Sequence, residues 1–183
     1  MYNIDIKSKQ QCIIFSTRDL KEDCVIISIN CPGETTKIFN NKNILDICTL
    51  QFDDIEEQID DLVLMTNEQA KKIKIFIDKY KDKVNNIVIH CAAGISRSAA
   101  VGCVIARYLN KTDDYLWQTG NFTPNKHVYR IMCKEFNIEF NEKEFNIKNK
   151  IKYKKDKLNN LINYSNYGIS EDDMFCDVII EKD

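Results

Sequence analysis

The chain has 183 residues, 44% of them hydrophobic, and a formal net charge of −2. This length fits one domain comfortably, and the composition suits a globular protein with a single buried core. The near balance of 26 basic and 28 acidic residues gives no electrostatic footprint for tight binding to nucleic acids or membranes.

The eight cysteines are predicted to be reduced thiols of a cytoplasmic protein rather than a disulfide framework. The amino terminus, Met1–Asp5, has neither the basic start nor the apolar stretch of a secretory signal. No apolar run approaches the roughly 18 residues needed to cross a bilayer. No cysteine or histidine spacing suits zinc, so neither a metal nor another cofactor is expected. Several cysteines lie inside apolar runs, where a free thiol packs as a small hydrophobe: Cys24, Cys48, Cys103 and Cys133.

Three segments in the first third of the chain carry strand signals. Asn3–Lys7 alternates in polarity, and after a brief apolar run at Cys12–Phe15 comes the β-rich segment Cys24–Ile29. That segment stops at a turn signal, Cys31–Glu34. Leu45–Phe52 is the third strand candidate.

From Thr66 onward the apolar residues recur at helical spacing. Thr66 and Gln69 form a capping-box pattern, which predicts an amphipathic helix over residues 67 to about 83. Asn86–His90 is typical of a short buried strand. Ser98–Leu109 and Asn125–Phe136 are then predicted to be helices.

This order of strand, helix, strand, loop and helix indicates an α/β fold with parallel strand pairing. In such folds the ligand crevice lies at the carboxyl ends of the strands. His90 ends one of the predicted strands, so the segment that follows it is expected to line that crevice.

The chain changes in composition near residue 141, and we expect a catalytic domain over residues 1–140 and a C-terminal extension over residues 141–183. Seven lysines lie between Lys143 and Lys157, interleaved with isoleucine and leucine, and an apolar run follows at Phe175–Ile180. The favoured interpretation is a surface helix and an edge strand packed on the same domain. A docking or partner-binding appendage is the alternative.

The segment from His90 to Ser98 has the pattern of a phosphate-binding loop with a nucleophile at its mouth. A strand leads to Cys91, five residues separate Cys91 from Arg97, and a helix follows. Successive backbone N–H groups in such a loop form an anion site, and the helix adds its positive end. Gly94 permits a turn that a side chain would obstruct, and Arg97 offers a planar fork for two phosphoryl oxygens. The predicted phosphate-binding residues are Ala92, Ala93, Gly94, Ile95, Ser96 and Arg97.

The same positive groups are expected to lower the pKa of the Cys91 thiol below its ordinary value of about 8.5. Cys91 is then a thiolate at neutral pH and can attack phosphorus. Ser98 can donate a hydrogen bond to the sulfur, above all when the thiolate leaves. His90 is expected to hold the loop backbone rather than to carry a proton.

These residues resemble the signature H-C-x-x-G-x-x-R-[ST] of the protein tyrosine phosphatase superfamily, and the wording A-A-G-I-S-R-S is similar to compact dual-specificity phosphatases. The resemblance covers roughly Cys24–Phe136. It implies a central, mostly parallel sheet flanked by helices. The chain lacks the Trp-Pro-Asp loop of the large tyrosine phosphatases, since its single tryptophan is Trp117.

The resemblance also implies that an aspartate on a separate upstream loop protonates the leaving oxygen. The sequence Leu50-Gln51-Phe52-Asp53-Asp54 is similar to the apolar-x-apolar-x-Asp pattern of small dual-specificity enzymes. This similarity favours Asp54 as the proton donor. Asp53 is the reserve candidate, and Asp60 and Asp61 are further acids in the same connection.

The function predicted from these residues is hydrolysis of phosphotyrosine, and of phosphoserine or phosphothreonine, in phosphoproteins through a phosphocysteine intermediate. Inorganic phosphate or sulfate is expected to occupy the same loop. The variable loop positions carry no lysine, which disfavours highly phosphorylated inositol lipids. Two alternatives remain: a phosphopeptide-binding module with little turnover, and a phosphatase acting on RNA 5′-phosphate ends.

Overall fold

The computed structural model describes residues 1–119 and 122–150. It divides into two units, of which the first is Met1–Phe140 and the second begins at Asn141. In the second unit, residues 142–150 are helical. The remainder of the predicted extension, including the strand expected at Phe175–Ile180, lies outside the described residues, and its packing on the catalytic domain stays a prediction.

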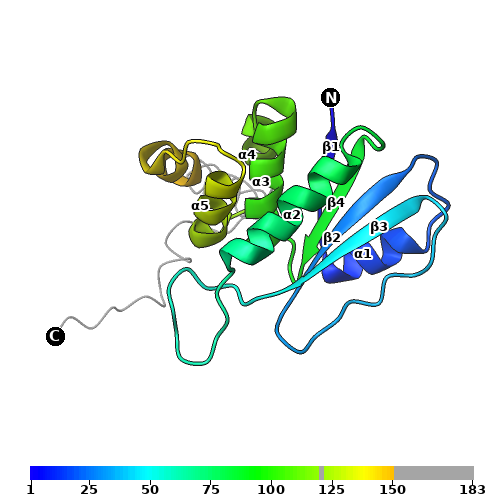
Figure 1. Cartoon of the computed structure of the whole chain (residues 1–183), viewed down its shortest axis with the longest axis horizontal. Helices are drawn as coiled ribbons and strands as arrows, with labels where there is room; N and C mark the ends of the chain where they lie inside the picture. Colours follow the sequence, from blue (N-terminus) through cyan, green and yellow to red (C-terminus); the bar gives the residue numbers. More distant parts are fainter. Residues whose placement is uncertain (120–121, 151–183) are drawn as a thin grey trace, which may run out of the picture. The chain divides into compact units, whose positions relative to one another are not determined.

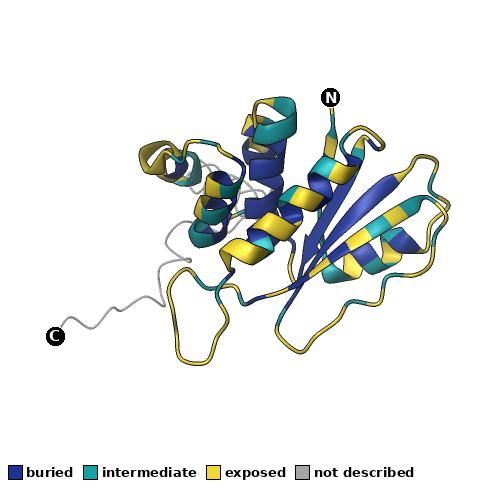
Figure 2. Ribbon diagram, in the orientation of Figure 1, coloured by how far each residue is buried: buried dark blue, intermediate teal, exposed yellow. Residues whose placement is uncertain are grey.

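The first unit is built on a four-stranded sheet in which every neighbouring pair of strands is parallel (Figure 1). In spatial order the strands are β1 (Asn3–Ser8), β4 (Asn86–Cys91), β2 (Cys24–Asn30) and β3 (Ile44–Gln51). All seven residues of β2 are buried, as its run of apolar residues predicts (Figure 2). The predicted α/β fold with a parallel central sheet is confirmed.

Helices lie on both faces of this sheet (Figure 1). One face is covered by α1 (Lys9–Ser16), where Cys12 packs with Ile26 and Val88. On the opposite face lie α2 (Asn67–Tyr80) and α3 (Arg97–Asn110), and two further helices follow, α4 (Asp114–Thr119) and α5 (Lys126–Glu135). None of the helices among the described residues is both long and apolar enough to span a bilayer.

The apolar run at Cys12–Phe15 belongs to α1, which the sequence did not identify as a helix. Ser8 caps this helix, because its hydroxyl accepts from the Gln11 N–H at 3.2 Å while the Gln11 side chain accepts from the Ser8 N–H at 2.8 Å. The helix has only eight residues, too few for its periodicity to stand out.

Close packing of α3 on β1 fixes the position of the loop before it. A Cβ atom built on Gly102 would lie 2.9 Å from Cδ1 of Ile6, so the Ile6 side chain would have to shift if this glycine were replaced. Ten consecutive residues of α3, from Arg97 to Ala106, are buried (Figure 2). The amino-terminal end of α3 is therefore held firmly at the carboxyl edge of the sheet.

Candidate active site

A five-residue loop, residues 92–96, joins the end of β4 to the start of α3, as predicted. Three of its carbonyl groups are held by backbone N–H groups of surrounding segments. These bonds run from Lys9 N to Ala92 O at 3.0 Å, from Thr123 N to Ile95 O at 2.9 Å and from Asn125 N to Ser96 O at 3.3 Å. In a trans peptide the N–H points opposite to the preceding carbonyl, so the N–H groups of Ala93, Ser96 and Arg97 turn toward the inside of the loop. This arrangement makes an anion site.

Gly94 sits at the tightest point of the loop. Its φ is +75°, and a Cβ atom there would lie 2.5 Å from both the carbonyl carbon of Lys7 and the backbone nitrogen of Ser8. Any side chain would therefore push the loop away from the junction of β1 and α1. The glycine is needed both for its backbone conformation and for this close approach.

We expect Gly94→Ala to destabilise the fold and to remove turnover. Gly33→Ala is a matched control, because Gly33 has a φ of +78° and nothing within 4 Å of a built Cβ. Both variants incur the left-handed backbone strain of roughly 1–2 kcal/mol, but only Gly94→Ala adds a backbone clash. Urea unfolding should show a larger loss of stability for Gly94→Ala, together with a loss of aryl phosphate hydrolysis that Gly33→Ala lacks. Equal losses of stability and activity in the two variants would contradict this.

The Cys91 thiol lies within the loop among hydrogen-bond donors. Its Sγ is 3.1 Å from Ser98 Oγ and accepts from the Gly94 N–H at 3.3 Å. Burial acts to raise the pKa of this thiol, but hydrogen bonds from the Ser98 hydroxyl, the Ser98 N–H and the Gly94 N–H, with the charge of Arg97, outweigh it and lower the pKa. The surroundings of Cys91 therefore favour the thiolate form.

Burial has the opposite effect on three other cysteines. It raises the pKa of Cys12 to about 12, and of Cys24 and Cys48 to about 11 each. The cysteines predicted to pack as small hydrophobes, Cys24, Cys48, Cys103 and Cys133, are indeed buried. Of Cys12, Cys24, Cys48 and Cys91, Cys91 alone has a lowered pKa.

The Arg97 side chain is 3% exposed, and its guanidinium is only partly satisfied. Nη1 donates to the Phe52 carbonyl at 2.7 Å and lies 3.5 Å from Sγ of Cys31. Nε is buried without a hydrogen-bond partner among the described residues and lies 3.9 Å from Oδ2 of Asp54. A buried donor left unpaired is costly, so this nitrogen fits the oxygen of a bound phosphoryl group.

The two adjacent aspartates after β3 have different partners. Oδ1 of Asp54 accepts from Ser96 Oγ at 2.7 Å and from Asn125 Nδ2 at 2.9 Å, which holds the carboxylate at the phosphate loop. Asp53 instead bonds within the connection that joins β3 to α2. Its Oδ2 accepts from the Val63 N–H at 2.8 Å, and its own N–H donates to the Val63 carbonyl at 2.7 Å. Asp60 and Asp61 are exposed farther along the connection.

His90 is fully buried next to Cys91. Its Nε2 lies 2.8 Å from Ser28 Oγ on β2, and Nδ1 lies 3.4 Å from the Cys91 carbonyl oxygen. Burial lowers the pKa of His90 to about 4, although the Cys91 carbonyl acts in the opposite direction. A neutral imidazole that ties the end of β4 to β2 suits the expected holding role.

The sequence did not identify Asn125 as part of the site. Its Oδ1 caps α5 by accepting from the Val128 N–H at 2.9 Å, while Nδ2 donates to Asp54 and, at 3.1 Å, to the Ile55 carbonyl. The asparagine before a helical pattern signals a cap. Its second role depends on which segment lies opposite, and no sequence pattern gives that.

The family model of the dual specificity phosphatase catalytic domain matches residues 11–120. The chain therefore belongs to the dual-specificity phosphatases, within the cysteine-dependent tyrosine phosphatase superfamily. The matched residues contain both the loop after Cys91 and the connection that carries Asp53 and Asp54, and they end before Asn125. No protein with a curated description matches the chain in sequence.

A solved structure shows the same fold, and two others are similar to a lesser degree. The human tyrosine phosphatase-like serine/threonine/tyrosine-interacting protein superposes with a TM-score of 0.54 and 18% identity, over 72% of this chain and 89% of that one. PTPMT1 in complex with PI(5)P gives a TM-score of 0.48 and 15% identity, over 74% and 90% of the two chains. OH1 from the Orf virus, a tyrosine phosphatase with triple substrate specificity, gives 0.41 and 18%, over 74% and 83%.

Proposed function

We propose that this phosphatase hydrolyses phosphotyrosine, and also phosphoserine and phosphothreonine, in proteins through a covalent phosphocysteine. The main support is the pairing of a thiol of lowered pKa, Cys91, with the buried and unpartnered Nε of Arg97. A nucleophile and an anion-binding donor thus flank the same five-residue loop. Nine contiguous residues, from His90 to Ser98, supply both groups.

In the first step the Cys91 thiolate attacks phosphorus. A bond forms between Sγ and phosphorus while the bond from phosphorus to the ester oxygen breaks. Arg97 and the inward N–H groups of the loop hold the non-bridging oxygens, which stabilises their charge. Asp54, in its protonated form, gives its proton to the leaving oxygen.

In the second step water releases the phosphate. Asp54, now ionised, takes a proton from the water molecule as its oxygen bonds to phosphorus. The bond between sulfur and phosphorus breaks, and the electron pair returns to Sγ. The Ser98 hydroxyl, 3.1 Å from Sγ, stabilises this leaving thiolate by hydrogen bonding.

Exposed apolar side chains at the phosphate loop favour an aryl phosphate. Ala92 and Ala93 are exposed, and Ile95 is 43% exposed. These groups can pack against the ring of a phosphotyrosine that reaches into the loop. A reactive thiolate also requires a reducing compartment, so we propose the cytoplasm as its location.

Replacement of Asp54 tests this assignment. We expect Asp54→Asn to lower kcat by about 10²-fold or more on substrates with poor leaving groups, because an amide cannot donate the proton. The loss should be larger with phenyl phosphate than with p-nitrophenyl phosphate, because the better leaving group needs the proton less. Values of kcat for the wild type and the variant with these two substrates measure both effects.

Asp53→Asn is the matched control for that experiment. Its side-chain oxygen can still accept from the Val63 N–H, so the connection should keep its shape and most of the activity should remain. A larger loss in Asp53→Asn than in Asp54→Asn would assign the proton transfer to Asp53.

A further inference from the structure

The connection from β3 to α2 that carries Asp54 is strongly acidic. Residues 53–61 read D-D-I-E-E-Q-I-D-D, with six acidic residues among nine and no basic one. The proposed reaction uses one of these carboxylates, and Asp53 closes the connection. The remaining four need another explanation: Glu56, Glu57, Asp60 and Asp61.

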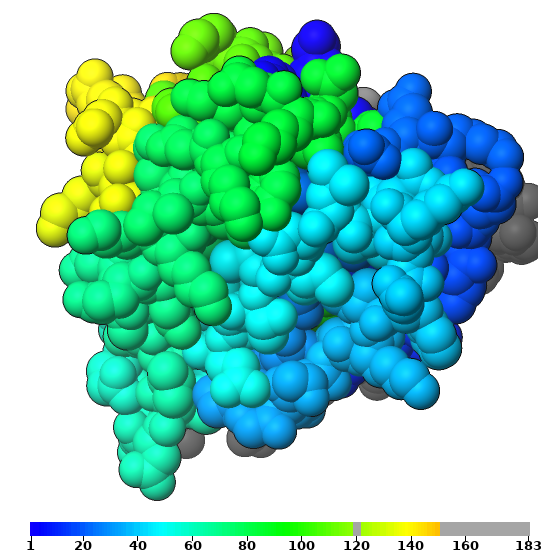
Figure 3. All heavy atoms as spheres, turned by 45° about the vertical axis from the view of Figure 1, so that its right-hand side comes forward, coloured from blue at the N-terminus to red at the C-terminus, as the bar shows by residue number. Residues whose placement is uncertain are grey.

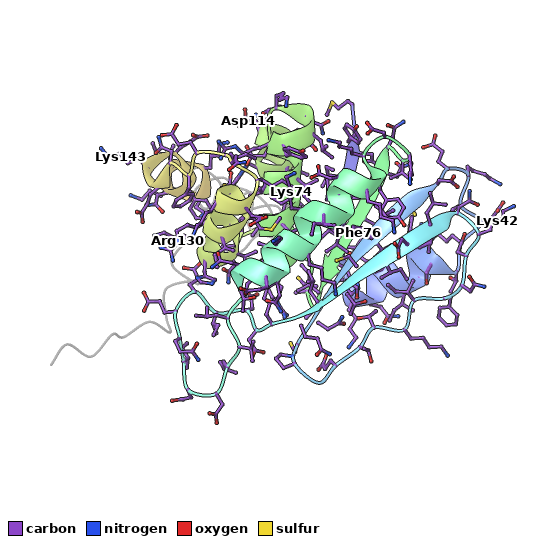
Figure 4. The ribbon with its side chains drawn as sticks, viewed as in Figure 1. Lys42, Lys74, Phe76, Asp114, Arg130 and Lys143 are labelled. Carbon is purple, nitrogen blue, oxygen red and sulfur yellow. The ribbon has the colours of Figure 1, made fainter. Side chains whose placement is uncertain are left out.

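Hydrogen bonds within the connection define its conformation. Asp53 is paired with Val63 at its base, and Gln58 Nε2 donates to the carbonyls of Asp60 and Leu62 at 2.9 and 2.8 Å. Asp60 has a φ of 39°, which marks a tight turn. In the space-filling view this segment protrudes at the lower left, and its oxygen-tipped side chains project outward (Figures 3 and 4). The acidic groups are thus displayed in a fixed arrangement.

Three of these carboxylates are uncommitted. Glu56 accepts from the backbone N–H of Lys126 at 2.7 Å. Glu57, Asp60 and Asp61 are exposed, and within the described part of the chain no cation or hydrogen-bond donor contacts their side chains. The start of α5, where the Lys126 N–H donates to Glu56, carries two basic residues, Lys126 and Arg130, against six acidic ones in the connection. Among the described residues these two segments together are therefore negatively charged.

This negative surface borders the phosphate site. Asp54 Oδ2 lies 3.9 Å from Arg97 Nε, and that buried donor without a partner marks the place of the ligand. Glu57 is three residues from Asp54, a reach of at most about 10 Å. The residues flanking a phosphorylated side chain extend over a similar distance, and charges act over about 8 Å at physiological salt.

We propose that this acidic connection selects phosphopeptides in which lysine or arginine flanks the phosphorylated residue; the proposal rests on the phosphatase activity proposed above. Attraction to Glu57, Asp60 and Asp61 raises the rate of productive encounter with a basic segment. The same charges repel substrates that are polyanionic around the reacting phosphate, such as RNA 5′ ends. In this proposal Cys91, Arg97 and the loop between them carry out the reaction. The acidic connection determines which phosphopeptides react faster.

The test compares two phosphotyrosine peptides of one length, one with lysines and one with glutamates around the phosphotyrosine. We expect kcat/KM of the full-length wild type to favour the basic peptide by about tenfold at low salt, with the difference shrinking at high salt. The triple variant Glu57→Lys, Asp60→Lys, Asp61→Lys should lose or reverse this preference. Its hydrolysis of p-nitrophenyl phosphate should stay within about twofold, because that substrate has no flanking residues.

A second triple variant, Asp19→Lys, Glu22→Lys, Asp82→Lys, makes the same change in net charge at exposed positions near the amino ends of the strands. It should keep the wild-type preference. The inferred selectivity is wrong if both triple variants lose the preference for the basic peptide equally. It is also wrong if a wild type that hydrolyses p-nitrophenyl phosphate shows no such preference. In both cases the proposed phosphatase activity still stands. Faster turnover of a 5′-phosphorylated RNA than of the basic peptide also overturns the inferred selectivity. A wild type inert toward p-nitrophenyl phosphate overturns the proposed function itself.

Discussion

Cys91→Ser is expected to lower aryl phosphate hydrolysis by more than about 10³-fold, since an unassisted serine hydroxyl is a far weaker nucleophile than a thiolate. Hydrolysis by the wild type should persist in excess chelator, because Arg97 and the loop N–H groups supply the positive charge. Phosphate release from p-nitrophenyl phosphate measures both results. Cys48→Ser, at a buried thiol of raised pKa, should keep its turnover per folded molecule.

The reactivity of the Cys91 thiol gives a measurement that needs no turnover. Its pKa is lowered, so a larger fraction of Cys91 than of an ordinary thiol is thiolate at the same pH. The pKa values of Cys12 and Cys24 are raised, so both stay protonated at neutral pH. Iodoacetamide at neutral pH or below should therefore label Cys91 first, as read by mass spectrometry. Survival of turnover in Cys91→Ser, or equal labelling of the three cysteines, would be incompatible with the mechanism.

The arrangement of the candidate site around Cys91 could be predicted from the sequence because its parts are contiguous. Cys91, Gly94, Arg97 and Ser98 lie on one strand, loop and helix, and local geometry alone brings them together. The strands were also predictable to within one or two residues. The central strands β2 and β4 are buried and mostly apolar, whereas the edge strands β1 and β3 mix polar and apolar residues. Helix α1 was missed because its apolar run is short, and its capping pair, Ser8 and Gln11, became evident in the structure.

What the sequence could not give was the direction of side chains supplied by distant segments. Asp53 and Asp54 are adjacent, yet one pairs with Val63 and the other with Ser96. Their different partners depend on how the connection folds back on itself. Asn125 faces Asp54 only because α5 begins beside the phosphate loop. Such contacts arise from tertiary packing, which no local pattern records.

Arg97→Lys should lower kcat/KM by about 10²- to 10³-fold, although the charge is kept. The Arg97 side chain donates to the Phe52 carbonyl through Nη1, and its Nε remains available to donate to a phosphoryl oxygen. A lysine ammonium is a single compact donor group and cannot meet both demands at these positions. Steady-state kinetics with p-nitrophenyl phosphate, and inhibition by inorganic phosphate, measure the loss in turnover and in anion binding.

Arg107→Lys is the matched control, because Arg107 lies on the same helix and holds Tyr129 OH and the Glu139 carbonyl at 3.1 and 3.2 Å. It should cost stability without the loss in turnover. Because Arg97→Lys keeps a positive charge near Cys91, the thiol should be alkylated at nearly the wild-type rate. Lost turnover with retained thiol reactivity then identifies the arginine fork as the anion holder. A fall in thiol reactivity that matches the fall in turnover would instead mean that Arg97 acts mainly through its charge on Cys91.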